Sequence, residues 1–220
     1  MASGPGYVAA DAVGRGASAV GIDFSSAMVS LARRIHPGIA FVQADAERLP
    51  FADRSFDAVA MNFGMLHLAR PDAALAEGHR VLRHGGRYAF SVWARPEEAI
   101  GFGIVLRAIE AHGTPDVGLP AGPPFFQFSD PAECGRSLAR AGFAHAEVRQ
   151  VPLMWTMPSA GALFDAVSQG GVRTAATLRA QTPEALCAIR GAVERAALQY
   201  DRGGTLDVPM SAIVASGVKR

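Results

Sequence analysis

The chain has 220 residues, half of them hydrophobic, and its 21 basic and 20 acidic side chains leave a formal net charge of +1. This size favours one domain with a substantial core, and the balanced charge, without a basic block, argues against a nucleic-acid partner. Cys134 and Cys187 form no C-x-x-C pair and no apolar stretch reaches about 20 residues, so we expect a cytoplasmic protein without a disulfide, a metal site or a membrane span.

The first two thirds of the chain alternate short β-rich runs with helical patterns. This alternation is typical of an α/β fold, in which helices cover both faces of a mostly parallel sheet. Buried parallel strands are nearly continuous apolar runs, and such runs occupy residues 17–22, 39–43, 57–63 and 88–93. Helices are expected between them, over residues 25–34 with a serine cap, and from Pro71 through Arg83.

The remaining sequence predicts further helices and an antiparallel strand near the C-terminus. Gly113 is placed to end a helix over 98–112, and Asp130 to cap one that Gly142 closes. A strand over 146–157 follows, then helices over 159–168 and 183–200, and a β-like segment over 206–218 that Pro209 interrupts. We therefore predict a single domain, 1–220, with a cofactor-binding core (1–112), a lid-like loop rich in Pro and Gly (113–128) and a helical insertion (158–204).

Small and acidic residues mark the expected ligand edge of the sheet. Gly4 and Gly6 open a helix, and Asp23 ends the next strand 17 residues beyond Gly6. Glycines let a backbone approach a ligand closely, and an acid at that strand tip can accept hydrogen bonds from the ribose hydroxyls of a nucleotide. Asp45 and Asn62 end the following two strands. Because ligands bind at the carboxyl ends of strands in open α/β sheets, the pattern predicts a nucleoside cofactor site.

With these features the chain resembles the class I, Rossmann-like methyltransferases that use S-adenosylmethionine. Within that class it is most similar to the small-molecule enzymes that have a single methyltransferase domain. The resemblance covers nearly all of residues 2–95 and depends on the order and spacing of several segments. These segments are Ala-Ser-Gly-Pro-Gly at 2–6, Val-Gly-Ile-Asp-Phe-Ser at 20–25 with Met28, Gln-Ala-Asp-Ala-Glu at 43–47, Leu-Pro-Phe at 49–51, Ser-Phe-Asp at 55–57, Leu-His-Leu at 66–68 and Arg-Val-Leu-Arg-His-Gly-Gly-Arg at 80–87.

The resemblance implies a role for each matching residue. The glycine turn would lie against the methionine part of S-adenosylmethionine, and Asp23 would bind the ribose beside Ser25. Phe24 and Met28 would line the adenosine. Asp45 and the backbone of Ala46 would bind the adenine, while Asn62, Phe63 and Leu66 would form the wall beside the sulfonium. The methyl group would then point at a pocket for a small-molecule acceptor.

The start of the chain departs from the family pattern. Family members begin with an apolar strand that carries an acid two positions before the Ala-Ser pair, whereas Met1 stands one residue too late to include it. That strand is central in the family's sheet. We therefore expect a chain truncated before its first strand, with unpaired backbone groups on the neighbouring strands, each costing about 1 to 3 kcal/mol where it is buried.

The implied reaction is an in-line displacement that mainly needs alignment and exclusion of water. His67 is the candidate general base, since an imidazole titrates near neutral pH; its alternative is a purely structural role. Two other functions stay open. An NAD-dependent oxidoreductase would share the glycine turn and Asp23. Its glycine motif, however, needs a third glycine, whereas Tyr7, Val8 and Ala9 follow Gly6. A Tyr-x-x-x-Lys pair is also missing, because Lys219 is the only lysine. A non-catalytic remnant or binding module is the other alternative.

Overall fold

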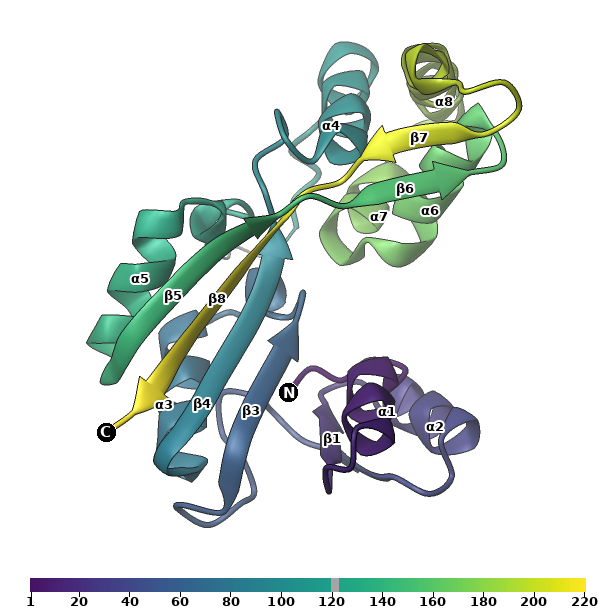
Figure 1. The fold of residues 1–220 in the computed structure, drawn as a ribbon. Helices are drawn as coiled ribbons and strands as arrows, with labels where there is room; N and C mark the ends of the chain where they lie inside the picture. The colour runs from purple at the N-terminus through teal and green to yellow at the C-terminus, as the bar shows by residue number, and fades with distance from the viewer. Residues whose placement is uncertain (120–122) are drawn as a thin grey trace. The chain divides into compact units, whose positions relative to one another are not determined.

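The structure, a computed structural model, describes residues 1–119 and 123–220. Its described residues divide into two compact units, whose helices and strands are drawn in Figure 1. The first contains residues 1–92, 123–149 and 213–220, and the second contains residues 93–119 and 150–212. None of the helices in these described ranges is long and apolar enough to cross a bilayer. The predicted lid-like loop falls partly at 120–122, outside the described residues.

The first unit is an α/β structure with two groups of strands. Its helices are α1 (Tyr7–Gly14), α2 (Ser26–Ile35), α3 (Pro71–Val81) and α5 (Pro131–Arg140), with short 3-10 turns η1 (Met65–His67) and η2 (Gln127–Ser129). Its strands are β1 (Val20–Asp23), β2 (Ala40–Gln43), β3 (Phe56–Asn62), β4 (Leu82–Trp93), β5 (Phe143–Val151) and β8 (Ala212–Lys219). The last residue of β4, the last two of β5 and the first of β8 belong to the second unit. The four strands expected in the first half of the chain are all present.

Strand pairing in the first unit is parallel where the sequence predicted it. β1 pairs with β2 in parallel, and β3 pairs with β4 in parallel, in a four-stranded sheet of order β3-β4-β8-β5. Figure 1 shows β8 running opposite to β4 and β5, so the predicted antiparallel strand near the C-terminus is confirmed. The prediction of an additional central strand before residue 1 stays a prediction.

Local sequence signals explain where several helices begin and end. The Ser25 hydroxyl caps α2 by accepting from the Met28 amide at 3.3 Å, and Asp130 caps α5 by accepting from the Ala132 amide at 3.0 Å. Gly142 follows α5 with a φ of 90°, a conformation that suits glycine. Gly113 ends α4 (Ile100–His112) as predicted, but with extended backbone.

Two predicted boundaries around the sheet are wrong. The helix from Pro71 ends at Val81 rather than Arg83, and β4 begins at once and continues through Gly85 and Gly86. The pairing of β3 with β4 shifts register between residues 56 and 58, and a Cβ on Gly86 would lie 3.0 Å from the Asp57 carbonyl oxygen. Glycine thus permits a close backbone approach within the strand instead of ending it.

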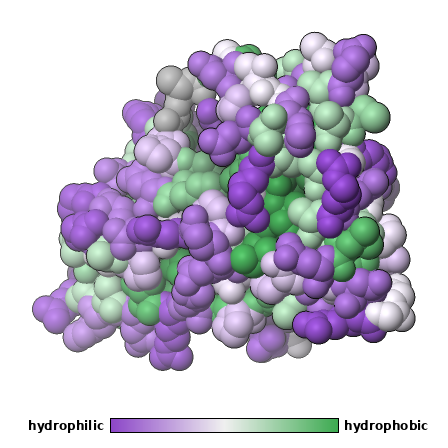
Figure 2. All heavy atoms as spheres, turned by 90° about the horizontal axis from the view of Figure 1, so that it is seen from above, coloured by the Kyte–Doolittle hydropathy of each residue, from purple (hydrophilic) through white to green (hydrophobic). Residues whose placement is uncertain are grey.

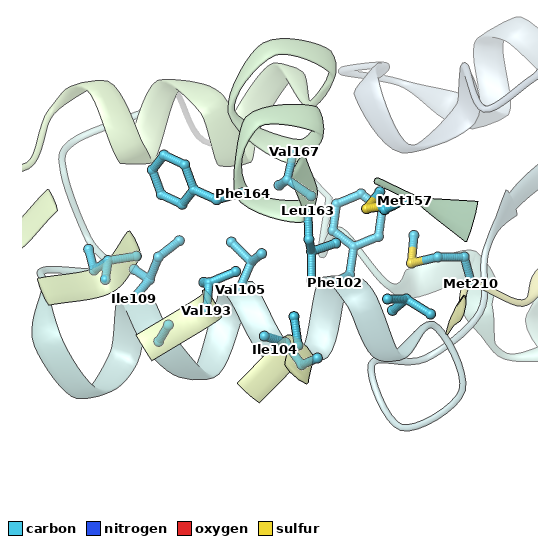
Figure 3. Close-up of a cluster of buried hydrophobic side chains, with 14 of the residues drawn as sticks. Phe102, Ile104, Val105, Ile109, Met157, Leu163, Phe164, Val167, Val193 and Met210 are labelled. Atoms are coloured by element: carbon cyan, nitrogen blue, oxygen red, sulfur yellow. The ribbon is translucent and has the colours of Figure 1, made fainter. Parts of the chain in front are cut away.

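The second unit packs four helices beside a two-stranded antiparallel sheet. Its elements are α4, β6 (Met154–Met157), α6 (Ala160–Gly170), α7 (Val172–Arg179), α8 (Pro183–Ala197), the short turn η3 (Leu198–Tyr200) and β7 (Leu206–Pro209). Figure 3 shows its core, in which side chains of α4, α6 and α8 meet Met157 and Met210. Leu163 and Val193 are fully buried there.

Three predictions for the second unit need correction. The single strand expected over 146–157 is two strands, because Pro152 interrupts it and β6 pairs with β7 rather than continuing in the sheet of β5. Pro209 ends β7, an edge strand of the two-stranded sheet, and β8 starts a new strand in another sheet, so the segment expected over 206–218 is also two strands. The helix α7 was not predicted; it begins at Val172, directly after Gly170 and Gly171.

Candidate functional site

The predicted site residues all lie in the first unit, beginning with a glycine turn at residues 2–6. The Ser3 amide donates to the Ile22 carbonyl at 2.8 Å, and the Gly6 amide donates to the Ser3 carbonyl at 2.9 Å. Gly4 and Gly6 have φ values of 50° and 91°, and Ala2 also has a positive φ of 47°. The turn therefore uses left-handed backbone at three positions in five residues, which favours glycine.

The two glycines have different surroundings. A Cβ on Gly6 would lie 2.5 Å from Cζ of the buried Phe41 and 3.1 Å from the His36 ring, so Gly6 serves packing. A Cβ on Gly4 would meet nothing within 4 Å. Gly4 therefore presents bare backbone to open space, where a ligand can approach.

Asp23 links the turn to the start of α2. Its Oδ2 accepts from the Gly4 amide at 2.8 Å, and its Oδ1 accepts from the Ser25 amide at 2.9 Å. A carboxylate has about four acceptor positions, so two stay available for hydroxyl donors. The side chain is thus held at the carboxyl end of β1 beside the turn, as the sequence predicted.

Apolar side chains beside Asp23 are exposed. Phe24 is 78% exposed and Met28 is 38% exposed, although both are large hydrophobic residues. Figure 2 shows hydrophobic residues among hydrophilic ones on one face of the molecule. An aromatic ring left this open next to an anchored carboxylate suits contact with a flat apolar ligand group.

Asp45 and Ala46 follow the neighbouring strand β2. The Ala44 amide donates to the Asp23 carbonyl at 3.0 Å, which keeps the ends of β1 and β2 together. Asp45 Oδ1 accepts from the Glu47 amide at 2.8 Å, while Ala46 is buried. The structure thus places the two predicted acids at adjacent strand ends.

The end of β3 is held by a residue that the sequence did not indicate. Ser91, on β4, donates from its hydroxyl to Oδ1 of Asn62, and the Phe63 amide lies 3.1 Å from the same hydroxyl and 3.0 Å from the Ser91 carbonyl. Phe63 has a φ of 52°, and such strain in a residue other than glycine often accompanies function. A serine in an apolar strand gives no distinctive signal, which is why sequence reasoning missed it.

Leu66 and His67 lie in η1, just beyond Phe63. Leu66 is half-buried, and the exposed His67 meets Phe125 edge-on with ring centroids 6.3 Å apart. Phe125 in turn meets Phe126 at 4.9 Å. Among the described residues, no group of His, Cys, Asp or Glu is arranged to hold a metal ion.

Comparison with known proteins finds a family model that matches the first part of the chain. A family model described as a methyltransferase domain matches residues 1–90, the segment that contains all the site residues predicted from the sequence. Residues 1–90 are similar to this methyltransferase-domain family. The matched segment of the chain also holds the glycine turn and the three strand ends, so the family match and the site geometry coincide.

Curated relatives are similar to part of the chain. The chain is similar to demethylmenaquinone methyltransferase of Beutenbergia cavernae, with 43% identity over 107 residues that cover 46% of this chain and 45% of the relative. The corresponding protein of Thermus thermophilus is 38% identical over 107 residues, covering 47% and 48%. The chain thus matches about half the length of these relatives.

Solved structures show the fold over the whole chain. The YcgJ protein from Bacillus subtilis has a TM-score of 0.63 at 18% identity, covering 100% of this chain and 89% of that one. The phosphoethanolamine N-methyltransferase 2 of Haemonchus contortus, in complex with S-adenosyl-L-methionine, has a TM-score of 0.56 at 17% identity, covering 100% and 47%. The predicted Rossmann-like α/β fold is confirmed.

Proposed function

We propose that this chain transfers the methyl group of S-adenosylmethionine to a small-molecule acceptor. The observation that carries the proposal is the Asp23 carboxylate, anchored by the Gly4 amide at 2.8 Å beside an exposed Phe24. A methyltransferase-domain match over these residues names the class of reaction. The unpaired cysteines favour a cytoplasmic location.

The residues present fit the cofactor. Gly4 leaves open space where any other residue would place a Cβ, which suits close contact with the backbone. Asp23 keeps acceptor capacity for the ribose hydroxyls, and Phe24 with Met28 offers apolar surface to the adenosine. When bound, S-adenosylmethionine supplies a methyl group activated by a positively charged sulfur.

The chain's own contribution is positioning. Ser91 holds Asn62 and Phe63 in place at the end of β3, and holding reacting groups in line contributes about 7 to 11 kcal/mol at the favourable limit. His67 is the proposed base for an acceptor that must lose a proton. With a hydroxyl acceptor, His67→Gln should lower kcat and leave the affinity for S-adenosylmethionine unchanged; an unchanged kcat and pH profile would remove His67 from the mechanism.

Calorimetric titration tests the cofactor assignment. S-adenosylmethionine, its demethylated product and NAD should be titrated against the chain, its Asp23→Ala variant and the matched control Asp11→Ala. Asp11 is an exposed acid on α1 that pairs with Arg15. We expect Asp11→Ala to bind S-adenosylmethionine normally and Asp23→Ala to bind at least about tenfold more weakly, a loss of about 1.4 kcal/mol.

Two outcomes would contradict the proposal. Binding of NAD in place of S-adenosylmethionine would favour the oxidoreductase alternative. No binding of any of the three ligands to a chain shown to be folded by its near-ultraviolet circular dichroism would favour a non-catalytic binding module.

A further inference from the structure

The turn that follows β2, residues 45–48, carries Asp45 and Ala46, which are expected to bind the adenine; we call it the adenine turn. Local hydrogen bonds close it. Asp45 Oδ1 accepts from the Glu47 amide at 2.8 Å, and the Asp45 carbonyl accepts from the Arg48 amide at 3.1 Å. Bonds between residues two or three apart shape a turn, but they do not fix it against the rest of the protein. The position of the adenine turn therefore depends on contacts with distant segments.

Glu47 makes such a contact with the start of α3. Its Oε1 accepts from the backbone amide of Arg70 at 2.7 Å, and its Oε2 accepts from Nε of the same residue at 2.9 Å. Arg70 is the N-cap residue of α3. A glutamate at the third helical position often bonds to this amide, but α3 has Ala73 there. Glu47 thus supplies, from 23 residues away, the carboxylate that the helix itself lacks.

The surroundings of Glu47 favour a firm contact. Its side chain is only 9% exposed, although it is charged. A partly buried ion pair is screened by salt less than a surface pair, and a hydrogen bond to an ionised group is stronger than a neutral one. A carboxylate at the amino end of a helix is also stabilised by the helix dipole. Both carboxylate oxygens bond to Arg70, so Glu47 can influence a ligand through the position of the adenine turn.

Other contacts hold a later part of the same loop. The Leu49 amide donates to Oε2 of Glu77 at 2.6 Å, and Arg80 donates to the carbonyls of Leu49 at 3.1 Å and Phe51 at 2.8 Å. These bonds fasten residues 49–51 to α3 beyond its first turn. Loss of the Glu47 carboxylate should therefore release the adenine turn while the rest of the loop stays in place.

We propose that Glu47 is a positioning residue for the adenine of the cofactor. Held by Arg70, it keeps the adenine turn where Asp45 accepts from the adenine amino group, and it does not touch the cofactor itself. This inference rests on the proposed function, which has S-adenosylmethionine as the cofactor. Loss of Glu47 should weaken recognition of the base more than binding of the rest of the cofactor.

The test compares two ligands that differ in the base alone. S-adenosylhomocysteine has an amino group that can donate to Asp45, whereas S-inosylhomocysteine has a carbonyl oxygen at that position, which cannot donate to a carboxylate. Calorimetry measures the dissociation constant of each ligand, and the ratio of the two constants measures recognition of the base. We expect the unmodified chain to bind S-adenosylhomocysteine at least about tenfold more tightly than S-inosylhomocysteine.

Three variants isolate the role of Glu47. In Glu47→Ala the ratio should fall below about threefold, mainly because S-adenosylhomocysteine binds more weakly. Glu47→Gln keeps an oxygen for the Arg70 amide, so its ratio should lie between those of Glu47→Ala and the unmodified chain. The matched control is Asp11→Ala, because Asp11 also bonds to an arginine Nε at 2.9 Å but is 65% exposed. Asp11→Ala should leave the ratio unchanged.

The outcomes separate this inference from the proposed function. Near-ultraviolet circular dichroism checks that each variant is folded, and Glu47→Gln decides the matter if Glu47→Ala does not fold. An unchanged ratio in the folded Glu47 variants would overturn the inference. Equal weakening of both ligands would also overturn it, because Glu47 would then have a structural role only. Equal affinity of the unmodified chain for both ligands would overturn it as well. Failure of the unmodified chain to bind either ligand would contradict the proposed function, and the inference with it.

Discussion

The two glycines of the turn should respond differently to the same substitution, because only one of them faces a buried ring. In Gly6→Ala the alanine must keep the backbone φ of 91°, and its methyl group would lie 2.5 Å from Cζ of Phe41, which is 2% exposed. Left-handed backbone costs an L-residue roughly 1 to 2 kcal/mol, and overpacking a core typically costs about 1 to 3 kcal/mol. We expect Gly6→Ala to lower the free energy of unfolding by roughly 2 to 5 kcal/mol.

Gly4→Ala is the matched comparison. Its φ of 50° lies in the left-handed region that other residues reach more readily, and its methyl group meets nothing within 4 Å. The expected stability loss is therefore about 1 kcal/mol. The same methyl group occupies the open space beside the Asp23 contact, so under the proposed function Gly4→Ala weakens cofactor binding without unfolding the chain.

Urea denaturation of both variants measures the difference, and a double-mutant cycle with Phe41→Leu locates its cause. Phe41→Leu removes the ring atom that would clash with the methyl group of Gly6→Ala. The loss of unfolding free energy caused by Gly6→Ala should therefore be about 1 to 3 kcal/mol smaller in the Phe41→Leu background. The cost of Gly4→Ala should not change. An identical cost for Gly6→Ala in both backgrounds, or equal costs for the two glycine variants, would refute the packing argument.

Three further predictions concern other described contacts. Lys219 is 7% exposed and donates hydrogen bonds to the carbonyls of His79, Arg80 and Leu82 at 2.7 to 3.3 Å. Lys219→Met leaves these carbonyls without their donor, so it should lower the free energy of unfolding, measured in urea, by at least about 2 kcal/mol. An unchanged free energy of unfolding would contradict a stabilising role for Lys219. Hydrogen bonds from Arg140, Arg136 and Ser137 lower the pKa of Glu133 from 4.5 to about 2, so the ionised Glu133 stabilises the fold above pH 4.5 and this stabilisation is lost as the pH falls toward 2. Glu133→Gln should reduce the change in unfolding free energy across that pH window by about 1 kcal/mol, a small value because the arginines are half exposed. An unchanged pH dependence in the variant would contradict this role of Glu133. Ser91→Ala should release Asn62 and Phe63 and lower cofactor affinity more than stability, which calorimetry and urea unfolding can compare; a loss of stability alone would assign Ser91 a structural role.

Local signals predicted much of the first unit. The Ser25 and Asp130 caps begin helices where a side-chain oxygen follows a strand or loop, and the apolar runs before Asp23 and Asn62 form parallel strands. These features depend on neighbouring residues alone, so a sequence pattern is enough to find them. Segments around Pro152 and Pro209 were misjudged because β-propensity does not specify which sheet a strand joins.

In the candidate site, too, some features follow from the sequence and others only from the tertiary structure. By itself the sequence determined the order of the glycine turn and the strand-end acids, since spacing along alternating strands and helices brings their carboxyl ends to one edge. Only the tertiary structure decided that Gly4 faces open space while Gly6 faces Phe41, and that Ser91 holds Asn62. It also decided that the turn after β2 is held by the start of α3, because this contact joins residues far apart in the chain.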